Sequence, residues 1–438
     1  MNPTAYPDAS RPRMVVAHAG RTDVGRVRSR NEDNLAIAPD LNLFIVADGM
    51  GGHRGGDEAS RQGCLVLEDY LRRHSAIIRS HDLRPTQLHR REVVRLLQDA
   101  IRTANERIIA DSELHADREG MATTVVLALL SGDRAFIAHV GDSRAILMRD
   151  GQVDLVTEDH SLFFELVRQG RLQKSSTFQY KNVVTRALGI RGSAVPEVTD
   201  FEVVPGDRIL LCTDGLHGYL DDAAALRLAG KGDLETAVGR LIAFANEAGG
   251  SDNITAILVE VLGTAGDADA SRRRDQVLAS LPIFARLSRG DRLRVVSACE
   301  CRTLEDGECL FREGDATDGL YAVLSGEVEL RRAGERVARF GTGGEFGEMS
   351  LLEKQPRLVT GVAVGPTEVL MLSRTTFESL LRRSPTLASQ LLSNLVRVLA
   401  VRLRNANDEL AILRDHLASE GREVPQVLPS DLIEEEAT

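Results

Sequence analysis

The sequence predicts an α+β protein in two parts: two packed β-sheets between layers of helices, then a small β-roll with a long C-terminal helix. From Met14 to Gly263, strand-like runs alternate with a few long amphipathic segments, which favours two sheets with helices on both outer faces. From Leu281 to Thr376, glycines punctuate short alternating runs, as in a small roll or barrel. From about Pro385 onward, an apolar stripe indicates one long helix.

The length of 438 residues exceeds what one ordinary core accommodates, so more than one domain is expected. The first residues lack an apolar signal core and the last are acidic and contain proline, so we expect both ends to be disordered. The expected division is a leader at residues 1–13, a first domain at 14–263, a linker at 264–276, a roll at 277–384, a long helix at 385–418 and an acidic tail at 419–438.

Composition and charge narrow the classes of partner. A net charge of −11 argues against nucleic acid or an anionic membrane, because both would require a basic surface. No apolar run approaches the length of a membrane span. The five cysteines are odd in number and sit mostly in apolar patterns, so we expect reduced thiols in a cytoplasmic protein.

The elements of the first part follow from hydrophobic periodicity and turn residues. The strands are expected at Val15–Ala19, Leu35–Ala38, Leu43–Ala47, Thr123–Leu130, Arg134–Val140, Arg144–Arg149, Val183–Thr185, Ile209–Cys212 and Ile254–Val261. The helices are expected at Glu58–His74, Leu88–Ser112, Leu162–Gln169 and Leu234–Ala248. Hairpin turns such as Asp150-Gly151 indicate antiparallel pairing.

Four aspartates stand at the ends of strand-like segments. The run LFIVA ends on Asp48, and Asp142, Asp214 and Asp252 adjoin three further runs. One such aspartate alone is usually only part of a turn. Their recurrence indicates carboxylates that converge at one edge of the sheets and share metal ions, which we weigh above four separate turns. The glycines after Asp48 let a backbone carbonyl approach the same site, and an oxygen-rich site suits a hard cation.

Eight short motifs follow one another between Gly20 and Val261. They are TDVGRVRSRNEDN, VADGMGGHRGG, ATT after Met121, HVGDSR, EDHS, NVVTRALG, LLCTDGL and SDNITAI. In this order they resemble the PPM family, the metal-dependent protein serine/threonine phosphatases of type 2C, in its bacterial form. The resemblance implies a four-layer α-β-β-α phosphatase sandwich. It also implies hydrolysis of phosphoserine and phosphothreonine by a water that two metal ions activate.

The resemblance carries the metal ligands with it. Asp48 would bridge two Mn²⁺ or Mg²⁺ ions and is catalytic for that reason, and the Gly49 carbonyl would contribute to one ion. Asp214 and Asp252 would hold the second ion, with Glu32 in its shell. This assignment agrees with the convergence of strand-end carboxylates expected from the sequence pattern.

Two further residues complete the implied site. Arg28 matches the arginine of the family that binds the substrate phosphate and assists catalysis, and its fork geometry suits a phosphate dianion. Asp142 matches the position of a third, weaker metal. The implied substrates are proteins that bacterial Ser/Thr kinases have phosphorylated. A phosphatase-like scaffold without activity is the less favoured alternative, because the implied metal ligands and Arg28 are all present.

The segment GGEFGEMSLLEKQPR gives the second part its resemblance to cyclic nucleotide-binding domains. The resemblance implies that backbone N–H groups near Gly347 cradle the phosphate of cAMP or cGMP, Glu348 accepts from the ribose and Arg357 pairs with the phosphate. The family usually places small residues after that arginine, whereas this chain has Leu358-Val359. Two alternatives stay open: a phosphatase regulated by cyclic nucleotide, and a roll that binds no nucleotide and serves dimerisation or docking.

The long helix carries a second periodic signal. An apolar stripe recurs at heptad spacing, at Leu392, Val396, Leu399, Leu403, Ala406, Leu410, Leu413 and Leu417. Such a stripe either covers the roll or forms a coiled coil, and its length beyond the roll favours a homodimer through this helix. The short acidic remainder does not fit a DNA-reading module.

Overall fold

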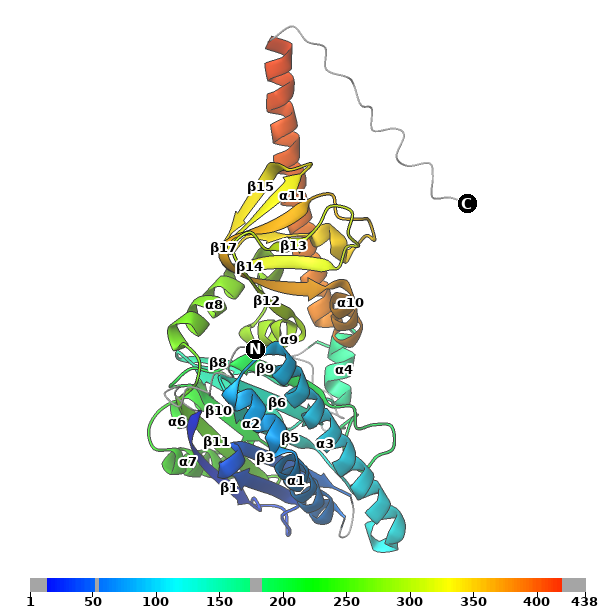
Figure 1. Ribbon diagram of the computed structural model, residues 1–438. Helices are drawn as coiled ribbons and strands as arrows, with labels where there is room; N and C mark the ends of the chain where they lie inside the picture. Colours follow the sequence, from blue (N-terminus) through cyan, green and yellow to red (C-terminus); the bar gives the residue numbers. More distant parts are fainter. Residues whose placement is uncertain (1–13, 52–54, 174–182, 420–438) are drawn as a thin grey trace.

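The computed structural model describes residues 14–51, 55–173 and 183–419. The predicted disordered leader at residues 1–13 and nearly all of the predicted disordered tail at residues 419–438 lie outside the described residues. Figure 1 shows two domains stacked along the molecule, with the long C-terminal helix extending beyond the second.

The first domain is a sandwich of two antiparallel sheets, as the sequence predicts. One sheet contains, in spatial order, β1 (Val15–Asp23), β11 (Ile254–Gly263), β10 (Arg208–Cys212), β7 (Arg144–Arg149) and β8 (Gln152–Leu155). The other contains β2 (Asp33–Ala38), β3 (Leu43–Met50), β5 (Val125–Ser131), β6 (Arg134–Val140) and β9 (Glu197–Glu202), with β4 (Ala122–Thr123) on β3.

Alternation along β3 explains why four layers form. Leu43, Ile45 and Ala47 are fully buried against the outer helices, whereas Phe44 and Val46 are fully buried against the opposite sheet. The helices over this sheet are α1 (Gly56–Arg73), α2 (Ser75–Leu83) and α3 (Gln87–Leu114). Those over the other sheet are α5 (Asp214–His217), α6 (Asp222–Ala229) and α7 (Leu234–Glu247). The predicted α-β-β-α architecture is therefore confirmed.

Two expectations about local structure are wrong. The predicted linker at residues 264–276 contains most of a helix, α8 (Ala268–Ser280), because Asp267 caps its N-terminus and accepts hydrogen bonds from two backbone N–H groups. Its Arg274 pairs with Glu202 of the first domain at 3.1 Å and with Glu368 of the second at 3.2 Å, so the segment bridges the domains. The predicted strand Val183–Thr185 is only an isolated bridge between Val184 and Ser161.

The second domain is a small antiparallel roll. Its strands are β12 (Glu300–Leu304), β13 (Cys309–Phe311), β14 (Gly319–Arg332), β15 (Glu335–Gly341), β16 (Glu345–Phe346) and β17 (Thr360–Ser373). Aromatic rings of Phe311, Tyr321 and Phe346 form its centre. The helices around the roll are α9 (Arg289–Ala298), α10 (Arg374–Arg383) and α11 (Pro385–Ser419), of which only the last was expected.

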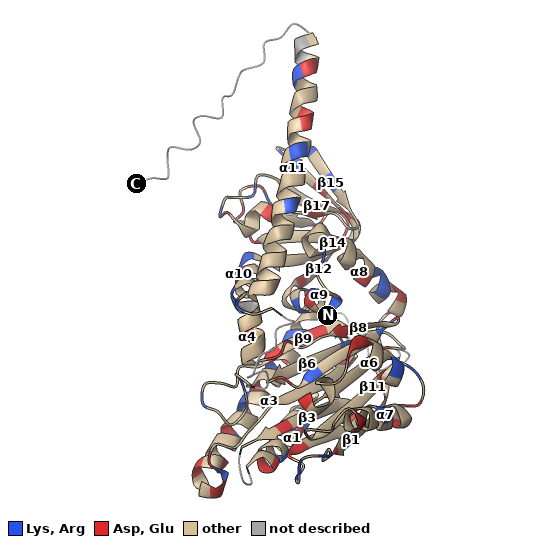
Figure 2. Ribbon diagram, turned by 180° about the vertical axis from the view of Figure 1, so that it is seen from behind, with Lys and Arg blue, Asp and Glu red and all other residues tan. Residues whose placement is uncertain are grey.

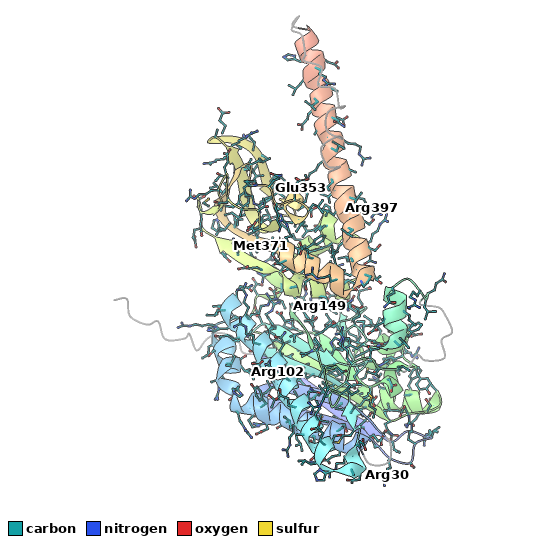
Figure 3. The ribbon with its side chains drawn as sticks, turned by 90° about the vertical axis from the view of Figure 1, so that its right-hand side faces the viewer. Arg30, Arg102, Arg149, Glu353, Met371 and Arg397 are labelled. Atoms are coloured by element: carbon teal, nitrogen blue, oxygen red, sulfur yellow. The ribbon has the colours of Figure 1, made fainter. Side chains whose placement is uncertain are left out.

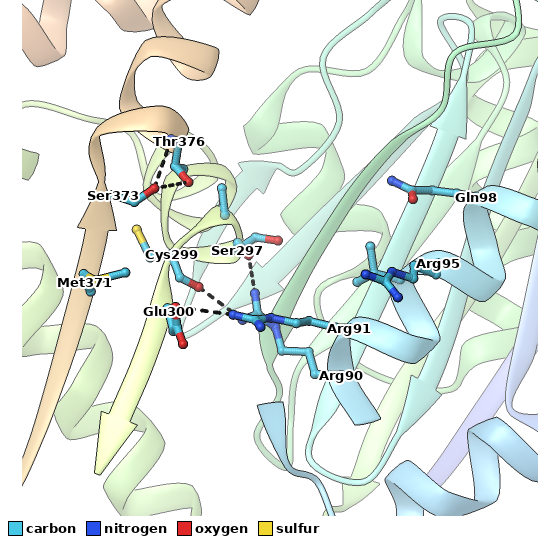
Figure 4. Close-up of a pocket in the computed structure, with 12 residues that line it drawn as sticks. Arg90, Arg91, Arg95, Gln98, Ser297, Cys299, Glu300, Met371, Ser373 and Thr376 are labelled. Carbon is cyan, nitrogen blue, oxygen red and sulfur yellow. Dashed lines mark hydrogen bonds and ion pairs between the residues drawn. The ribbon is translucent and has the colours of Figure 1, made fainter. Parts of the chain in front are cut away.

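A buried ion-pair network lies at the junction of the two domains. Arg90 of α3 donates to Asp200 of β9 at 2.6 and 2.9 Å, and Arg134 donates to the same carboxylate at 2.6 Å. Arg90 also donates to the carbonyls of Ser297 and Cys299, at the end of α9 (Figure 4). Burial opposes the charge on Asp200, but the two arginines outweigh it and lower its pKa to about 2. The interface therefore stays charged and paired at neutral pH.

None of the helices among the described residues is both long and apolar enough to cross a bilayer. All five cysteines are free thiols, and Cys64, Cys212 and Cys299 are buried. The expectation of reduced thiols agrees with this arrangement.

Stability of the first domain should depend on pH through His81 of α2. Its ring is fully buried, bonded to the Ser131 hydroxyl at 2.9 Å, and burial lowers its pKa to about 4. The unfolded chain binds a proton at His81 below about pH 6.5, whereas the folded chain does not until about pH 4, so unfolding becomes easier as pH falls through this window. At about pH 5 the His81 contribution to this loss is about 2 kcal/mol.

We therefore expect His81→Gln to reduce the fall in unfolding free energy between about pH 7 and about pH 5, measured by urea denaturation. The control is His74→Gln, which alters an exposed histidine of the same helical layer. An unchanged pH dependence in His81→Gln would contradict the assignment.

Candidate metal centre

The strand-end aspartates converge at one edge of the sandwich, as the sequence pattern predicts. Asp48 lies near the end of β3, Asp142 follows β6, Asp214 begins α5 directly after β10, and Asp252 precedes β11. Burial raises the pKa of Asp48 well above its usual range, and the charges of Asp33, Asp214, Asp142 and Asp252 raise it further. Five carboxylates from separate strands therefore share one electrostatic environment.

The backbone at Asp48 and Gly49 is fixed by hydrogen bonds. The Asp48 carbonyl accepts from the Thr123 hydroxyl and from the Thr124 N–H, both at 2.9 Å, so its carboxylate stays available to the cluster. A Cβ at Gly49 would lie 2.1 Å from the Gly56 carbonyl oxygen, and hence only glycine fits. Glycine is therefore required at position 49 for a steric reason.

Glu32 lies beside this turn, with its backbone held from two sides. Its N–H donates to the Asn253 side chain at 2.8 Å, and its carbonyl accepts from the Ser60 hydroxyl at 2.6 Å. A Cβ at Gly56 would lie 2.8 Å from the Glu32 carboxylate, so that side chain rests against the start of α1. Burial and the charge of Asp57 raise its pKa.

Asp33 is a member of the cluster that the sequence did not single out. It pairs across the sheet with Asp48, and its carboxylate accepts from the hydroxyls of Thr213 at 2.9 Å and Thr255 at 2.7 Å. Burial raises its pKa to about 7, against the effect of the two threonines. In the sequence, Asp33 is visible only as the residue after Glu32. Its place in the cluster follows from the strand register, which sets Asp33 opposite Asp48.

Arg28 reaches the cluster from the exposed turn between β1 and β2. Its guanidinium donates to the Asp252 carboxylate at 2.7 Å, and its side chain remains about half exposed, at 52%. It therefore stands at the mouth of the site with donors available to a second anion.

Asp142 is a buried member of the cluster. Burial raises its pKa to about 7, and the charges of Asp214 and Asp159 contribute. Its carbonyl is bonded to a ring nitrogen of His217 at 3.0 Å. The neighbouring Gly141 N–H donates to His160, whose other ring nitrogen lies 3.2 Å from a Glu197 oxygen. These partners hold the turn that carries Asp142.

The donor set fits a hard divalent cation. All the side chains that converge are carboxylates, and one oxygen of Asp214 is buried with no hydrogen-bond partner in the described part of the chain. Buried carboxylate oxygens need a cation or a proton, and Mn²⁺ and Mg²⁺ prefer such oxygens. The predicted ligands Asp48, Asp214 and Asp252 thus share one electrostatic environment with Asp33 and Asp142, and the charge of Asp252 also reaches Glu32.

The predicted nucleotide site in the roll has a partly formed phosphate cradle. Gly347 has a φ of +83°, and a Cβ there would lie 2.8 Å from the Arg357 guanidinium. Arg357 is buried, donates to the Ser350 hydroxyl and the Gly319 carbonyl at 3.0 Å, and pairs with Asp318. Its Nε is buried without a partner among the described residues, as expected for a group that awaits an acceptor.

Glu348, Leu358 and Val359 complete the description of that site. Glu348 lies 3.0 Å from Arg402 of α11, so the cradle contacts the long helix. Leu358 is 70% exposed and Val359 packs against the core of the roll. The side chain of Leu358 therefore points largely to solvent, while the Arg357 guanidinium stacks on the Phe311 ring at 4.2 Å.

Comparison with known proteins identifies both domains. A family model described as protein phosphatase 2C matches residues 25–259, and one described as a cyclic nucleotide-binding domain matches residues 301–384. A serine/threonine phosphatase, stp, of Listeria innocua is 39% identical over 249 residues, covering 55% of this chain and 94% of that protein.

A solved structure with a TM-score of 0.50 gives the same picture for the first domain. The S. agalactiae serine/threonine phosphatase is 32% identical and covers 56% of this chain and 100% of that one, with a TM-score of 0.50. The catalytic domain of PstP, solved in complex with 2 manganese ions, is 33% identical and covers 57% of this chain and 99% of that one, with a TM-score of 0.49.

Proposed function

The chain belongs to the protein phosphatase 2C family and carries a cyclic nucleotide-binding domain, and we propose that the second domain regulates the hydrolytic activity of the first. It is a serine/threonine protein phosphatase that acts on phosphoproteins. The proposal adds that phosphoserine and phosphothreonine are cleaved at the carboxylate cluster and that cyclic nucleotide tunes the output. The observation that carries the catalytic part is the convergence of Asp48, Asp214 and Asp252 beside the exposed Arg28.

The residues of the cluster divide into metal ligands and supports. Asp48 and the Gly49 carbonyl, together with Asp214, Asp252 and Glu32, would hold two Mn²⁺ or Mg²⁺ ions, and Asp142 would hold a third. When bound, the ions supply a water acidic enough to attack phosphorus in line. Asp33 belongs to the supports, because its carboxylate is already bonded to Thr213 and Thr255 and fixes the strands on either side of the ligands.

Arg28 binds the phosphate in this proposal. Its guanidinium already binds the carboxylate of Asp252. A phosphate dianion offers acceptor oxygens in a similar arrangement and carries more negative charge, so the same guanidinium can bind it. The arginine lies on an exposed turn, so it reaches the substrate without burying an unpaired charge. It therefore positions the phosphoryl group over the cluster.

The second domain contacts a segment that leads into the site. Arg294 of α9 donates to the carbonyls of Val156 and Thr157 at 3.4 and 3.3 Å. Two residues further on, Asp159 holds Arg144 through two hydrogen bonds of 2.9 and 2.7 Å and contributes to the raised pKa of Asp142. A movement of α9 would thus act on the surroundings of Asp142, which gives regulation a physical route.

The long helix supports the alternative use of the second domain. Leu391 and Leu395 of α11 are buried against the roll, and Leu399 of the heptad stripe packs against the same core, so only part of the stripe lies on the outer face. Members of the stripe are exposed by 39% to 64%, at Leu392, Val396, Leu403, Leu410 and Leu413. Figure 2 shows acidic and basic residues along the part of α11 beyond the roll. We therefore include a homodimer through the exposed part of this stripe in the proposal. The proposed location is the cytoplasm.

The catalytic proposal predicts that the full-length chain hydrolyses a phosphothreonine peptide only with Mn²⁺ or Mg²⁺. Asp214→Asn removes a ligand charge, and we expect kcat/KM to fall by at least about 100-fold. The control, Asp221→Asn, makes the same change at the N-cap of α6, where asparagine caps equally well. Full activity in Asp214→Asn, or activity independent of metal, would overturn the assignment.

The regulatory proposal predicts saturable binding of cAMP or cGMP to the full-length chain, measured by calorimetry. Arg357→Lys keeps the charge but loses the fork, so affinity should fall by about tenfold or more, whereas the exposed Arg332→Lys should have no effect. Thermal unfolding of both variants checks that the roll is folded. Absence of binding near about 1 mM, equivalent to about 4 kcal/mol, would favour the dimerisation and docking alternative.

A further inference from the structure

The turn that carries Arg28 holds two more arginines. Arg26, Arg28 and Arg30 occupy alternate positions of the turn 24–30, and all three are exposed. Val24 and Val27 of the same turn are exposed by 37% and 70%, so the turn presents an apolar surface between positive charges. Figure 3 places Arg30 at the end of the phosphatase domain that faces away from the roll, where a large substrate has access.

The turn is fixed to the metal-binding loop. The Asn253 side chain, next to Asp252, donates to the carbonyls of Val24 at 3.0 Å and Arg30 at 2.8 Å, which closes the turn at both ends. The Arg26 N–H donates to the Gly250 carbonyl at 2.8 Å. A Cβ at Gly25 would lie 2.2 Å from the Asp252 carbonyl oxygen, so the backbone packs directly on the loop. The positions of the arginines are therefore set relative to the catalytic cluster.

The charges of this turn extend beyond what phosphate binding requires. Arg28 pairs with Asp252 at 2.7 Å, and the backbone of Arg30 is bonded to the neighbouring Asn253 at 2.8 Å, so both arginines lie at the edge of the cluster. Arg26 has no ion-pair partner in the part of the chain that the structure describes. The chain as a whole has a net charge of −11, so it repels anionic peptides except at a local positive surface.

We propose that Arg26 and Arg30 make this phosphatase select substrates with an anionic side chain close to the phosphorylated residue. The inference rests on the proposed function, because it places a phosphoserine or phosphothreonine at Arg28 and the cluster. The neighbouring residues of the substrate then lie along the turn, with Val24 and Val27 against its apolar parts. The anion is either a carboxylate or a second phosphate, and both present oxygens to guanidinium groups.

The test compares peptides with one phosphothreonine and the same core, flanked by Asp and Glu, by Ala or by Lys, and one peptide with a second phosphothreonine. We expect the wild-type chain to show a kcat/KM about tenfold higher for the acidic than for the neutral peptide, through KM rather than kcat. The preference should shrink as salt rises, because exposed charges are screened. The doubly phosphorylated peptide distinguishes a carboxylate from a phosphate as the preferred anion.

Charge-reversal variants test whether Arg26 and Arg30 cause the preference for acidic peptides. Arg26→Glu with Arg30→Glu should turn the preference toward the Lys-flanked peptide, and Arg26→Glu alone should reduce it, which keeps the test valid if the double variant is unstable. The matched control is Arg79→Glu, an exposed position on α2, which packs at the opposite end of β5 from the cluster. It should retain the wild-type ratio between peptides.

Two results would overturn the inference, and they separate its own failure from failure of the proposed function. Equal kcat/KM for acidic, neutral and Lys-flanked peptides would show that the phosphatase is active without reading flanking charge. No metal-dependent hydrolysis of any phosphothreonine peptide would instead remove the proposed function on which the inference rests.

Discussion

The mutual repulsion of buried and half-buried carboxylates at one edge of the sandwich is the constraint on which the structure of the first domain depends. Asp33 and Asp48 are cross-strand partners, and Asp214 and Asp252 enter from the other sheet. Like charges at such positions destabilise a fold unless protons or cations neutralise them. The surrounding hydroxyls of Thr213 and Thr255 compensate only one of these carboxylates. Arg28 pairs with Asp252, and a proton or a divalent cation can neutralise the other carboxylates, so we propose that metal binding also stabilises this edge of the fold.

The same constraint explains the sequence around the site. Glycine at position 49 is required because a side chain would collide with the backbone of α1, and this contact brings Glu32 close to Asp48. Asn253 ties both ends of the arginine turn to the loop that carries Asp252. Arg28, the proposed phosphate-binding residue, and Asp252, a proposed metal ligand, are therefore held by one set of contacts. A change at Asn253 would displace both together.

The sequence predicted the parts of this arrangement that local patterns determine. Asp48, Asp214 and Asp252 were found because each adjoins an unbroken apolar run, and the long helix because its stripe persists for several turns. Asp33 was missed because its role depends on pairing with another strand, which no local pattern contains. The linker was misjudged because small and charged residues suit both a solvated segment and a helix, and the cap at Asp267 decides between them. The contact of α9 with β9 could not be predicted from the sequence either, because it joins segments far apart in the chain.

The account is tested most directly by the effect of Mn²⁺ on the thermal unfolding of the full-length chain. A cation that binds only the folded state raises the midpoint as its concentration increases, whereas neutral salt at equal ionic strength only screens the charges. We expect a rise with Mn²⁺ that Asp214→Asn largely removes and Asp221→Asn retains. The same midpoint in Mn²⁺ and in matched neutral salt would contradict the claim that this carboxylate cluster is a metal centre.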